Sequence, residues 1–362
     1  MKGLYVHIPF CEHICFYCDF CKRVPKNKEM VVAYLNTLKV EYERVKDMKF
    51  DTIYIGGGTP SMLDLDVLTN LLELFKNQNP TEFTIEVNPE SYTEEKGLLF
   101  KKFGVNRVSL GVQTFNEKIL KKLNRHHVND DVFNTVNHLY KIGIDNVSVD
   151  LIFALPNQTI KDIKCDLDMI GRLGIKHISY YSLILEEKTA FHVWYQQDKY
   201  MPQDIDVEAD MYVFILDELK KMGYIQYEIS NFAKSEKYQS KHNILYWTLS
   251  PYEAIGAGSH GFNEMDRYTH STNITSYIND PSITKFSQTS ENLYEDFLIF
   301  GLRMTKGINL DEVKKRFNRD PLNDFPTLLS YINEGYLDYS KPYLSLTRKG
   351  LLVMNQIVEV FL

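Results

Sequence analysis

Short apolar strands alternate with amphipathic helices in the first half of this chain, and this order constrains the fold more than any other feature. Six segments have the composition of strands: Leu4–Ile8, Thr52–Ile55, Phe83–Val87, Arg107–Leu110, Asn146–Ile152 and His177–Leu183. Helical spacing of apolar residues predicts helices over 28–45, 63–75, 94–102, 130–141 and 160–173. Repeated βαβ units predict a parallel sheet, either an incomplete (β/α)6 barrel or an open, doubly wound sheet.

Each predicted strand has one aliphatic face and one polar face, because side chains along a strand alternate sides. In the first strand, for example, Tyr5 lies opposite the aliphatic residues. We expect the aliphatic faces to pack on the helices and the polar faces to line a shared interior. Glu86, Gln113 and Asp150 fall near the carboxyl ends of their strands, where barrel enzymes build their sites. One such residue could serve only a local hydrogen bond, but several together favour a polar barrel interior.

The strand–helix alternation stops near residue 290, so we predict two domains, 1–290 and 291–362. The second domain contains predicted helices over 295–304, 310–317 and 327–334, the short strands G-Y-L-D-Y and Y-L-S-L, and a last helix from Lys349. This order is typical of a helical, winged-helix-like module. The net charge is -7 and no basic cluster is present, so we expect a structural cap and no nucleic-acid partner.

Neither a membrane span nor a signal peptide is apparent in the sequence. No segment approaches the ~20 consecutive apolar residues that cross a bilayer. The N-terminus M-K-G-L-Y-V-H-I-P-F is too short and too polar for a secretory signal. We therefore expect a cytoplasmic protein, in which disulfides are disfavoured and clustered cysteines indicate a metal site.

Four of the five cysteines fall between positions 11 and 21, whereas Cys165 stands alone in a predicted helix. The run C-E-H-I-C-F-Y-C places Cys11, Cys15 and Cys18 in one loop directly after a strand. Three thiolates from one loop can hold three irons of a 4Fe-4S cluster and leave the fourth iron open. Cys21 could add a fourth thiolate, the number that structural zinc prefers. On spacing alone, a zinc-stabilised binding module therefore remains an alternative.

A glycine run, Y-I-G-G-G-T-P, occupies residues 54–60 between a predicted strand and a predicted helix. Glycine lets a backbone approach a ligand closely and adopt positive φ. No Lys-Ser/Thr pair follows, so the run is not a phosphate loop. Alone it could be a tight turn, but after a three-cysteine loop it favours a ligand site.

Several long strings resemble the radical S-adenosylmethionine superfamily and, within it, the oxygen-independent coproporphyrinogen III oxidase family. They are Y-V-H-I-P-F-C, G-G-G-T-P-S, E-V-N-P-E, G-V-N-R-V-S-L-G-V-Q-T-F, D-L-I-F-A-L-P-N-Q-T and Y-E-I-S-N-F-A. The resemblance implies an incomplete (β/α)6 barrel with Cys11, Cys15 and Cys18 as ligands of a 4Fe-4S cluster. In that family the open iron is chelated by S-adenosylmethionine, and an electron from a donor protein splits this cofactor to a carbon radical.

The resemblance also assigns contacts to S-adenosylmethionine. The matching positions are Tyr5, Tyr17, Gly57, Gly58, Thr59, Glu86, Gln113, Arg125 and Asp150. Carboxylates there can accept hydrogen bonds from ribose hydroxyls, and Arg125 can pair with a carboxylate. Four of these positions, Tyr5, Glu86, Gln113 and Asp150, also lie on the polar strand faces identified above.

The family contains two branches: oxidases, which decarboxylate the propionates of a porphyrinogen, and heme chaperones, which bind heme and deliver it to other proteins. Oxidases resemble a longer protein with an N-terminal extension, whereas this chain begins just before its first strand. Oxidases also carry C-x-x-x-C-x-x-C-x-C, whereas Phe20 occupies the last position of that pattern here. Cys21 departs from both branches and is expected to be a spare thiol.

The segment H-N-I-L-Y-W, residues 242–247, matches the H-N-x-x-Y-W motif of the chaperone branch. Imidazole is a common axial ligand of heme iron, and Tyr and Trp offer flat apolar surfaces. We therefore expect heme to contact His242, Asn243, Tyr246 and Trp247, although on chemistry alone His242 and Trp247 could be packing residues. His260, in the following A-I-G-A-G-S-H-G-F segment, is expected to be structural or supporting rather than a ligand.

The expected function is thus heme binding and transfer to heme-requiring proteins, such as respiratory and membrane-associated ones. Anaerobic coproporphyrinogen III decarboxylation is the first alternative. Metal analysis would separate both from the zinc module.

Overall fold

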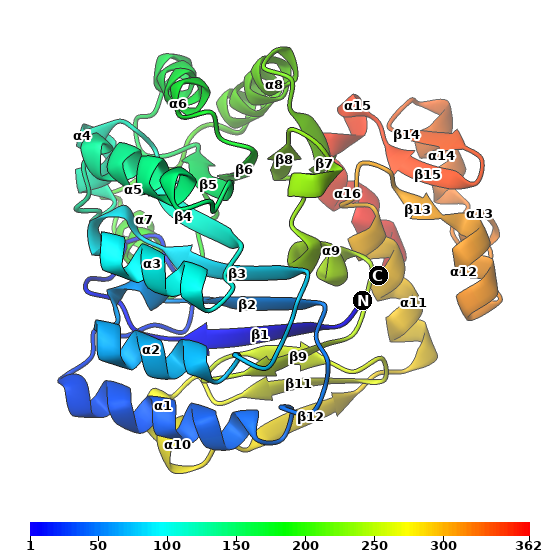
Figure 1. Ribbon diagram of the computed structural model, residues 1–362. Coiled ribbons are helices and arrows are strands. Elements are labelled where there is room, and N and C mark those ends of the chain that lie inside the picture. The colour runs from blue at the N-terminus through cyan, green and yellow to red at the C-terminus, as the bar shows by residue number, and fades with distance from the viewer.

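The computed structural model describes residues 1–362 and begins with a curved parallel sheet, which carries helices on its outer face (Figure 1). The central strands are β1 (Gly3–Ile8), β2 (Thr52–Gly57), β3 (Glu82–Val87), β4 (Arg107–Gln113), β5 (Asn146–Phe153) and β6 (His177–Ser182). They follow one another in chain order across the sheet, each parallel to the next. A doubly wound sheet would reverse its strand order at a switch point. The structure therefore confirms the incomplete barrel.

The helices that accompany these strands include all five that the sequence predicted. They are α1 (Lys28–Tyr42), α2 (Leu65–Glu73), α3 (Glu94–Lys102), α4 (Glu117–Lys122), α5 (Asn129–Lys141), α6 (Ile160–Leu173), α7 (Ala190–Gln196) and α8 (Ile205–Lys221). Sequence analysis did not predict α4, α7 or α8. None of the helices in the structure combines the length and the apolar character needed to cross a bilayer.

Helix α6 illustrates how local sequence sets an element. The Thr159 side chain accepts from the backbone N–H of Asp162, and the Asp162 carboxylate accepts from the backbone N–H of Thr159, which forms a capping box. At the other end Gly174 adopts φ +63°, the left-handed conformation that ends many helices. Between these caps the helix buries one apolar stripe against the sheet.

The aliphatic faces of the strands lie in the main hydrophobic core, as the sequence predicted. Leu4, Val6 and Ile8 of β1 are fully buried there, within a cluster of 53 buried residues. Burying one such side chain contributes roughly 1.5–3 kcal/mol to folding. Because these residues face the helices, the opposite faces of the same strands remain free to build a polar interior.

Further strands extend both edges of the barrel into a sheet of 12 strands. Beside β6 lie two antiparallel strands, β8 (Asn231–Ala233) and β7 (Ile225–Glu228). Beside β1 lie the parallel strand β9 (Tyr252–Ile255) and three antiparallel strands, β10 (His260–Phe262), β11 (Asp266–His270) and β12 (Ile283–Ser287). Two short helices, α9 (Lys241–Trp247) and α10 (Ile274–Asn279), complete this extension.

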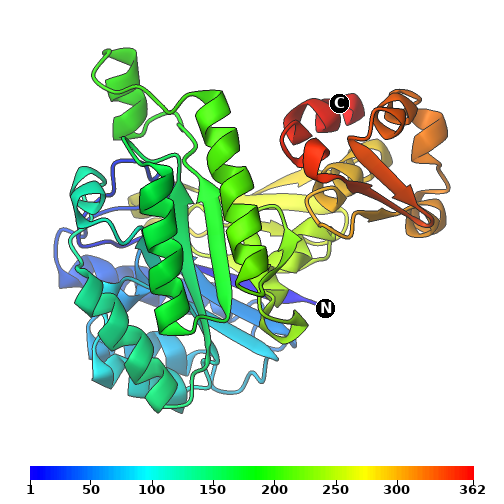
Figure 2. The same cartoon turned by 90° about the horizontal axis from the view of Figure 1, so that it is seen from above.

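The C-terminal part lies beside the barrel in both views (Figures 1 and 2). Its elements are α11 (Ser290–Gly301), β13 (Ile308–Asn309), α12 (Leu310–Phe317), α13 (Pro321–Asp324), α14 (Thr327–Asn333), β14 (Leu337–Ser340), β15 (Tyr343–Leu346), α15 (Arg348–Leu351) and α16 (Met354–Val358). The three strands form a separate small sheet. A second core of 14 buried residues fills this part and also includes Leu249 and Phe262 of the extension. The expected single last helix is in fact two short ones.

Candidate functional site

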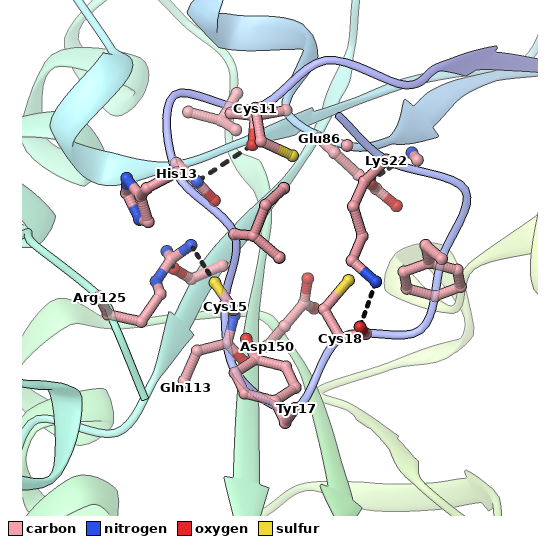
Figure 3. Close-up of a pocket in the computed structure, with 18 of the residues that line it drawn as sticks. Cys11, His13, Cys15, Tyr17, Cys18, Lys22, Glu86, Gln113, Arg125 and Asp150 are labelled. Atoms are coloured by element: carbon pink, nitrogen blue, oxygen red, sulfur yellow. Dashed lines mark hydrogen bonds between the residues drawn. The ribbon is translucent and has the colours of Figure 1, made fainter. Parts of the chain in front are cut away.

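The cysteine loop follows β1 and is held at its base by backbone hydrogen bonds. The N–H of Cys11 donates to Arg23 O at 3.1 Å, and the N–H of Arg23 donates to Pro9 O at 2.7 Å. The sulfur atoms of Cys11, Cys15 and Cys18 lie along the inner side of the loop (Figure 3). The cysteines of the chain are all free thiols.

The glycine run lies directly against this loop. Gly58 donates its N–H to Ile8 O at 2.8 Å, and Thr59 donates to Phe10 O at 2.7 Å. A β-carbon at position 58 would lie only 2.6 Å from Phe10 O, so the close approach requires glycine. Gly57 has φ +114°, a conformation that L side chains rarely adopt. The run therefore fixes the start of the cysteine loop.

One cavity of about 130 Å³ joins the loop to the carboxyl ends of the strands. It brings together nearly all residues predicted for the cluster and for S-adenosylmethionine. These are Cys11, Cys15, Cys18, Tyr17, Gly57, Gly58, Thr59, Glu86, Gln113, Arg125 and Asp150. We call this space the cluster cavity. Of the predicted set, Tyr5 alone does not line it.

Glu86 and Asp150 supply the carboxylates of the cluster cavity. Glu86 accepts from the Tyr54 hydroxyl at 2.7 Å and from the Gly57 N–H at 2.9 Å. Burial raises the pKa of Glu86 from 4.5 to about 7, although these hydrogen bonds oppose the shift. Burial also raises the pKa of Asp150, which accepts from the hydroxyls of Ser109 at 2.9 Å and Ser148 at 3.2 Å.

Gln113 and Arg125 border the cavity on its β4 side. Gln113 has φ +68° and follows a shift of register between β4 and β5, a strained, bulged strand end of the kind found at functional sites. The buried Arg125 donates to Gly111 O, and its Nη1 lies 4.0 Å from Cys15 Sγ. Its Nη2 lies 3.8 Å from the Glu90 carboxylate. This guanidinium is thus placed between the cysteine loop and the strand ends.

The three cysteines of the loop fit an iron–sulfur cluster by their donor chemistry. Burial raises the pKa of Cys11 to about 12 and that of Cys18 to about 11, so both are neutral thiols without a metal. Binding iron would displace these protons. Cys21 does not join them, because its thiol donates to Thr272 O at 3.3 Å and lines a different cavity. Cys165 is exposed.

Sequence analysis gave no cofactor role to several residues that line the cluster cavity, and Tyr181 and Lys22 are two of them. Tyr181 lines it and donates its hydroxyl to Gln113 Oε1 at 3.4 Å. The period of two along β6 places Tyr181 opposite the buried Ile178 and Tyr180, so the strand pattern could have identified it. Lys22 also lines the cavity and donates to Cys18 O (Figure 3), and no motif marked it.

A second cavity of about 330 Å³ lies beyond the cysteine loop, between β1, the extension and α11. Its walls are largely aromatic: Phe20, Tyr246, Trp247, Tyr252, Phe262 and Phe300. We call it the aromatic cavity. Tyr5 lies here, where its hydroxyl bonds with His7 Nδ1 at 2.9 Å. Phe20 lines both cavities and so marks their boundary.

The residues predicted to contact heme divide between this cavity and the protein interior. Tyr246 and Trp247 line the aromatic cavity. His242 is fully buried and lines neither cavity, since its Nδ1 bonds with the Thr52 hydroxyl at 2.8 Å and its Nε2 with the Tyr246 hydroxyl at 2.9 Å. Asn243 also lines neither. In this conformation both ring nitrogens of His242 are occupied, so its role as an iron ligand stays a prediction.

Glu82 fixes α9 in this position. Its carboxylate accepts from the N–H groups of Lys241 and His242, each at 2.9 Å. A carboxylate at a helix N-terminus satisfies free N–H groups and complements the helix dipole. Because Glu82 and Thr52 begin their strands, α9 is fastened to the amino ends of β2 and β3.

Comparison with known proteins assigns the chain to a family. Residues 5–170 match the radical SAM superfamily, and residues 288–353 match the HemN C-terminal domain. The heme chaperone HemW of Bacillus subtilis (strain 168) is 36% identical, over 100% of this chain and 99% of the relative. HemW of Lactococcus lactis (strain IL1403) is 37% identical over 100% and 97%, and that of Escherichia coli (strain K12) is 30% identical over 99% and 98%.

The fold has a close match among solved structures. Coproporphyrinogen III oxidase (HemN) from Escherichia coli, a radical SAM enzyme, superposes with a TM-score of 0.85 at 20% identity, covering 99% of this chain and 89% of that one. At this identity the match shows the fold alone. The full-length relatives are more informative, and by them this chain belongs to the HemW family of the radical SAM superfamily.

Proposed function

We propose that this protein is a heme chaperone that carries a 4Fe-4S cluster, binds S-adenosylmethionine beside it and transfers heme to heme-requiring proteins. The observation that carries the proposal is the pair of adjoining cavities, one with three thiols and buried carboxylates, the other with aromatic walls. The full-length similarity to proteins named heme chaperone supports the same function.

The cluster cavity is proposed to hold the 4Fe-4S cluster and S-adenosylmethionine together. Cys11, Cys15 and Cys18 would hold the cluster, which supplies electron transfer and an open iron when bound. Glu86 and Asp150 accept hydrogen bonds and would orient ribose hydroxyls of S-adenosylmethionine. Arg125 would pair with its carboxylate.

The backbone and neighbouring side chains complete this proposed cofactor site. Gly57, Gly58 and Thr59, which line the cluster cavity beside the cysteine loop, would contact S-adenosylmethionine. Tyr17 and Gln113 would line the remainder of the S-adenosylmethionine site. Tyr5 would contribute to this site from the neighbouring aromatic cavity. We further propose an electron-donor protein as a partner, because the cluster must be reduced.

The aromatic cavity is proposed to receive heme. Tyr246 and Trp247 offer flat apolar surface to a macrocycle. His242 would orient the Tyr246 ring by its hydrogen bond to the Tyr246 hydroxyl. Asn243 lies next to His242 in α9 and is proposed to belong to the same heme-binding segment. Direct ligation by His242 would require its ring to leave both of its present partners.

The proposal extends to the location, partners and domains of the protein. We place it in the cytoplasm, with heme-requiring proteins, respiratory and membrane-associated ones among them, as recipients and with no nucleic-acid partner. We also keep residues 1–290 and 291–362 as its two domains, the second capping the first.

A paired anaerobic assay of the reconstituted protein tests this proposal. Iron, sulfide and zinc are quantified first, and we expect about four irons and four sulfides per chain. Heme is then titrated while the Soret band is followed, and coproporphyrinogen III conversion is measured in parallel. Heme binding without conversion supports a chaperone. Conversion of coproporphyrinogen III without heme binding would show that the protein is an oxidase instead. Zinc without iron or sulfide would contradict the proposed 4Fe-4S cluster.

A further inference from the structure

The aromatic cavity contains a histidine that the function proposed above does not use. His260 is the first residue of β10, lines this cavity and is exposed. It makes no hydrogen bond or ion pair with another side chain of the protein. In a cavity with aromatic walls, an imidazole without a partner is available to a ligand.

The other histidines near this cavity are already engaged. His7 lines the cavity, but its Nδ1 bonds with the Tyr5 hydroxyl and its Nε2 with Cys21 O at 2.7 Å. His270 is buried, with Nδ1 on the Ser259 hydroxyl at 2.9 Å and Nε2 against the Glu41 carboxylate. His242 bonds through both nitrogens, as described above. His260 therefore differs from its neighbours in having free coordination capacity.

We propose that the aromatic cavity is the heme site and that His260 supplies the axial ligand of the iron. This inference rests on the proposed function, because it takes heme as the cargo. It assigns the ligand to a residue that sequence analysis expected to be structural. Neutral imidazole is the usual proximal ligand of heme iron in globins and peroxidases.

The surroundings of His260 favour the form of the ring that binds iron. Desolvation lowers the pKa of His260, and the neighbouring His270 and Arg267 lower it further. The ring is therefore neutral near pH 7 and keeps a lone pair on one nitrogen.

The shape of the cavity suits a flat, mostly apolar cargo. Rings from the cysteine loop, α9, β9, β10 and α11 meet here, and Tyr246 packs edge-on against Tyr252 at 4.7 Å between ring centroids. A volume of about 330 Å³ is at the low end for ligand pockets. A macrocycle would therefore remain partly exposed, which suits a cargo that must be handed on.

One guanidinium borders the same cavity. Arg267 of β11 lies over the rings of Phe262 and Phe300, at 5.3 Å and 5.6 Å from their centroids. Its Nη2 pairs with Asp296 at 2.7 Å, and the side chain is 32% exposed. A planar guanidinium can bind a second carboxylate through its remaining N–H groups. A heme propionate is such a carboxylate.

The test compares heme binding by the wild-type protein with that of His260→Ala and of His192→Ala, a histidine control on α7 that lines neither cavity. Loss of the outer partners of metal sites costs about 10–100-fold in affinity, so loss of the ligand itself should cost at least about tenfold. We expect this loss, with a shifted Soret band, in His260→Ala and wild-type behaviour in His192→Ala.

A chemical rescue separates ligation from a structural role. His260→Gly, shown to be folded by circular dichroism, is titrated with heme with and without free imidazole. We expect imidazole to restore the Soret position of the wild-type complex. A folded variant in which imidazole changes nothing would overturn the assignment.

The controls also keep the two proposals apart. If the wild-type protein binds no heme, the proposed function and this inference fall together. If the wild-type protein binds heme and His260→Ala binds it equally well with an unchanged Soret band, only the ligand assignment falls. Retained affinity with a shifted band would support the assignment, because the iron has changed its ligand.

Discussion

The two cavities are neighbours, yet they are constructed differently. Backbone contacts and buried hydrogen bonds determine the cluster cavity, in which Gly58 touches the cysteine loop and Glu86 accepts two hydrogen bonds. Packing of rings from distant segments determines the aromatic cavity, and His260 on its wall has no side-chain partner. The first arrangement suits a permanently bound cofactor, and the second suits a ligand that must leave.

Replacing a cysteine in each cavity should give the largest expected effect, measured as the iron and sulfide content of the protein. In Cys15→Ser we expect iron and sulfide to fall almost to zero, because a neutral hydroxyl is a poor iron ligand. Cys21→Ser is the matched control and should keep its full cluster, since Cys21 lies in the aromatic cavity. Iron and sulfide analysis after anaerobic reconstitution measures both.

The same variants test whether the cavities work separately. Heme affinity should be retained in Cys15→Ser, because no cysteine of the cluster cavity lines the heme site. A loss of heme binding that parallels the loss of iron would break the distinction between the two cavities.

Glu86 should couple the stability of the cluster cavity to pH. Burial raises its pKa from 4.5 to about 7, so between these values the folded protein binds a proton that the unfolded chain has released. The stabilisation is complete below pH 4.5 and is lost as the pH rises through 7, a change of about 3 kcal/mol. Urea unfolding of the metal-free protein at several pH values measures it.

Removing the titrating group provides the control for this pH effect. Glu86→Gln keeps the shape of the side chain but cannot titrate, so its stability should vary less between pH 5 and pH 8. A pH profile identical to that of the wild-type protein would place the titration elsewhere.

A variant of His242 tests whether the motif histidine is a heme ligand or a packing residue. The motif predicts a ligand, whereas in the structure both ring nitrogens bond with internal hydroxyls. His242→Ala leaves the hydroxyls of Thr52 and Tyr246 without their partner, and an unsatisfied buried polar group costs about 1–3 kcal/mol. We expect a lower free energy of unfolding and an unchanged Soret position in the folded fraction. Tyr246→Phe, which removes one of these bonds, should cost less.

A contrary result for His242 would be informative. If folded His242→Ala loses the Soret band while His260→Ala keeps it, the motif histidine is the ligand. Its ring must then move out of its buried position when heme binds.

The contrast between the cavities also explains what the sequence could predict. The cluster cavity was foreseeable because its parts are contiguous strings, Cys11 to Cys18 and Gly56 to Thr59, joined to strand ends of known polarity. The alternation of strands and helices predicted a parallel sheet, and the polar faces of several strands favoured the barrel over the doubly wound sheet. Tyr5 was on a polar face as predicted, but the strand pattern could not show which of two adjoining cavities that face would border.

The aromatic cavity was less accessible to sequence reasoning because it depends on tertiary packing. Its walls come from positions between Tyr5 and Phe300, so no local spacing reveals it. The motif identified Tyr246 and Trp247, but hydrogen-bond partners decide whether a histidine is free. Thr52 is 190 residues from His242, and no local pattern connects them.

Arg267 should have the smallest effect and gives the finest test of how heme lies in the aromatic cavity. Partly exposed ion pairs contribute about 0.2–1 kcal/mol, so Arg267→Gln should weaken heme binding by no more than about fivefold. Heme dimethyl ester lacks propionate charges, and its affinity should be the same for the wild-type protein and the variant. Parallel Soret titrations with the two porphyrins provide the measurement. Equal weakening for both porphyrins would mean that Arg267 supports the rings of Phe262 and Phe300 rather than a propionate. A selective effect on heme would place the charged edge of the macrocycle toward Arg267 of β11.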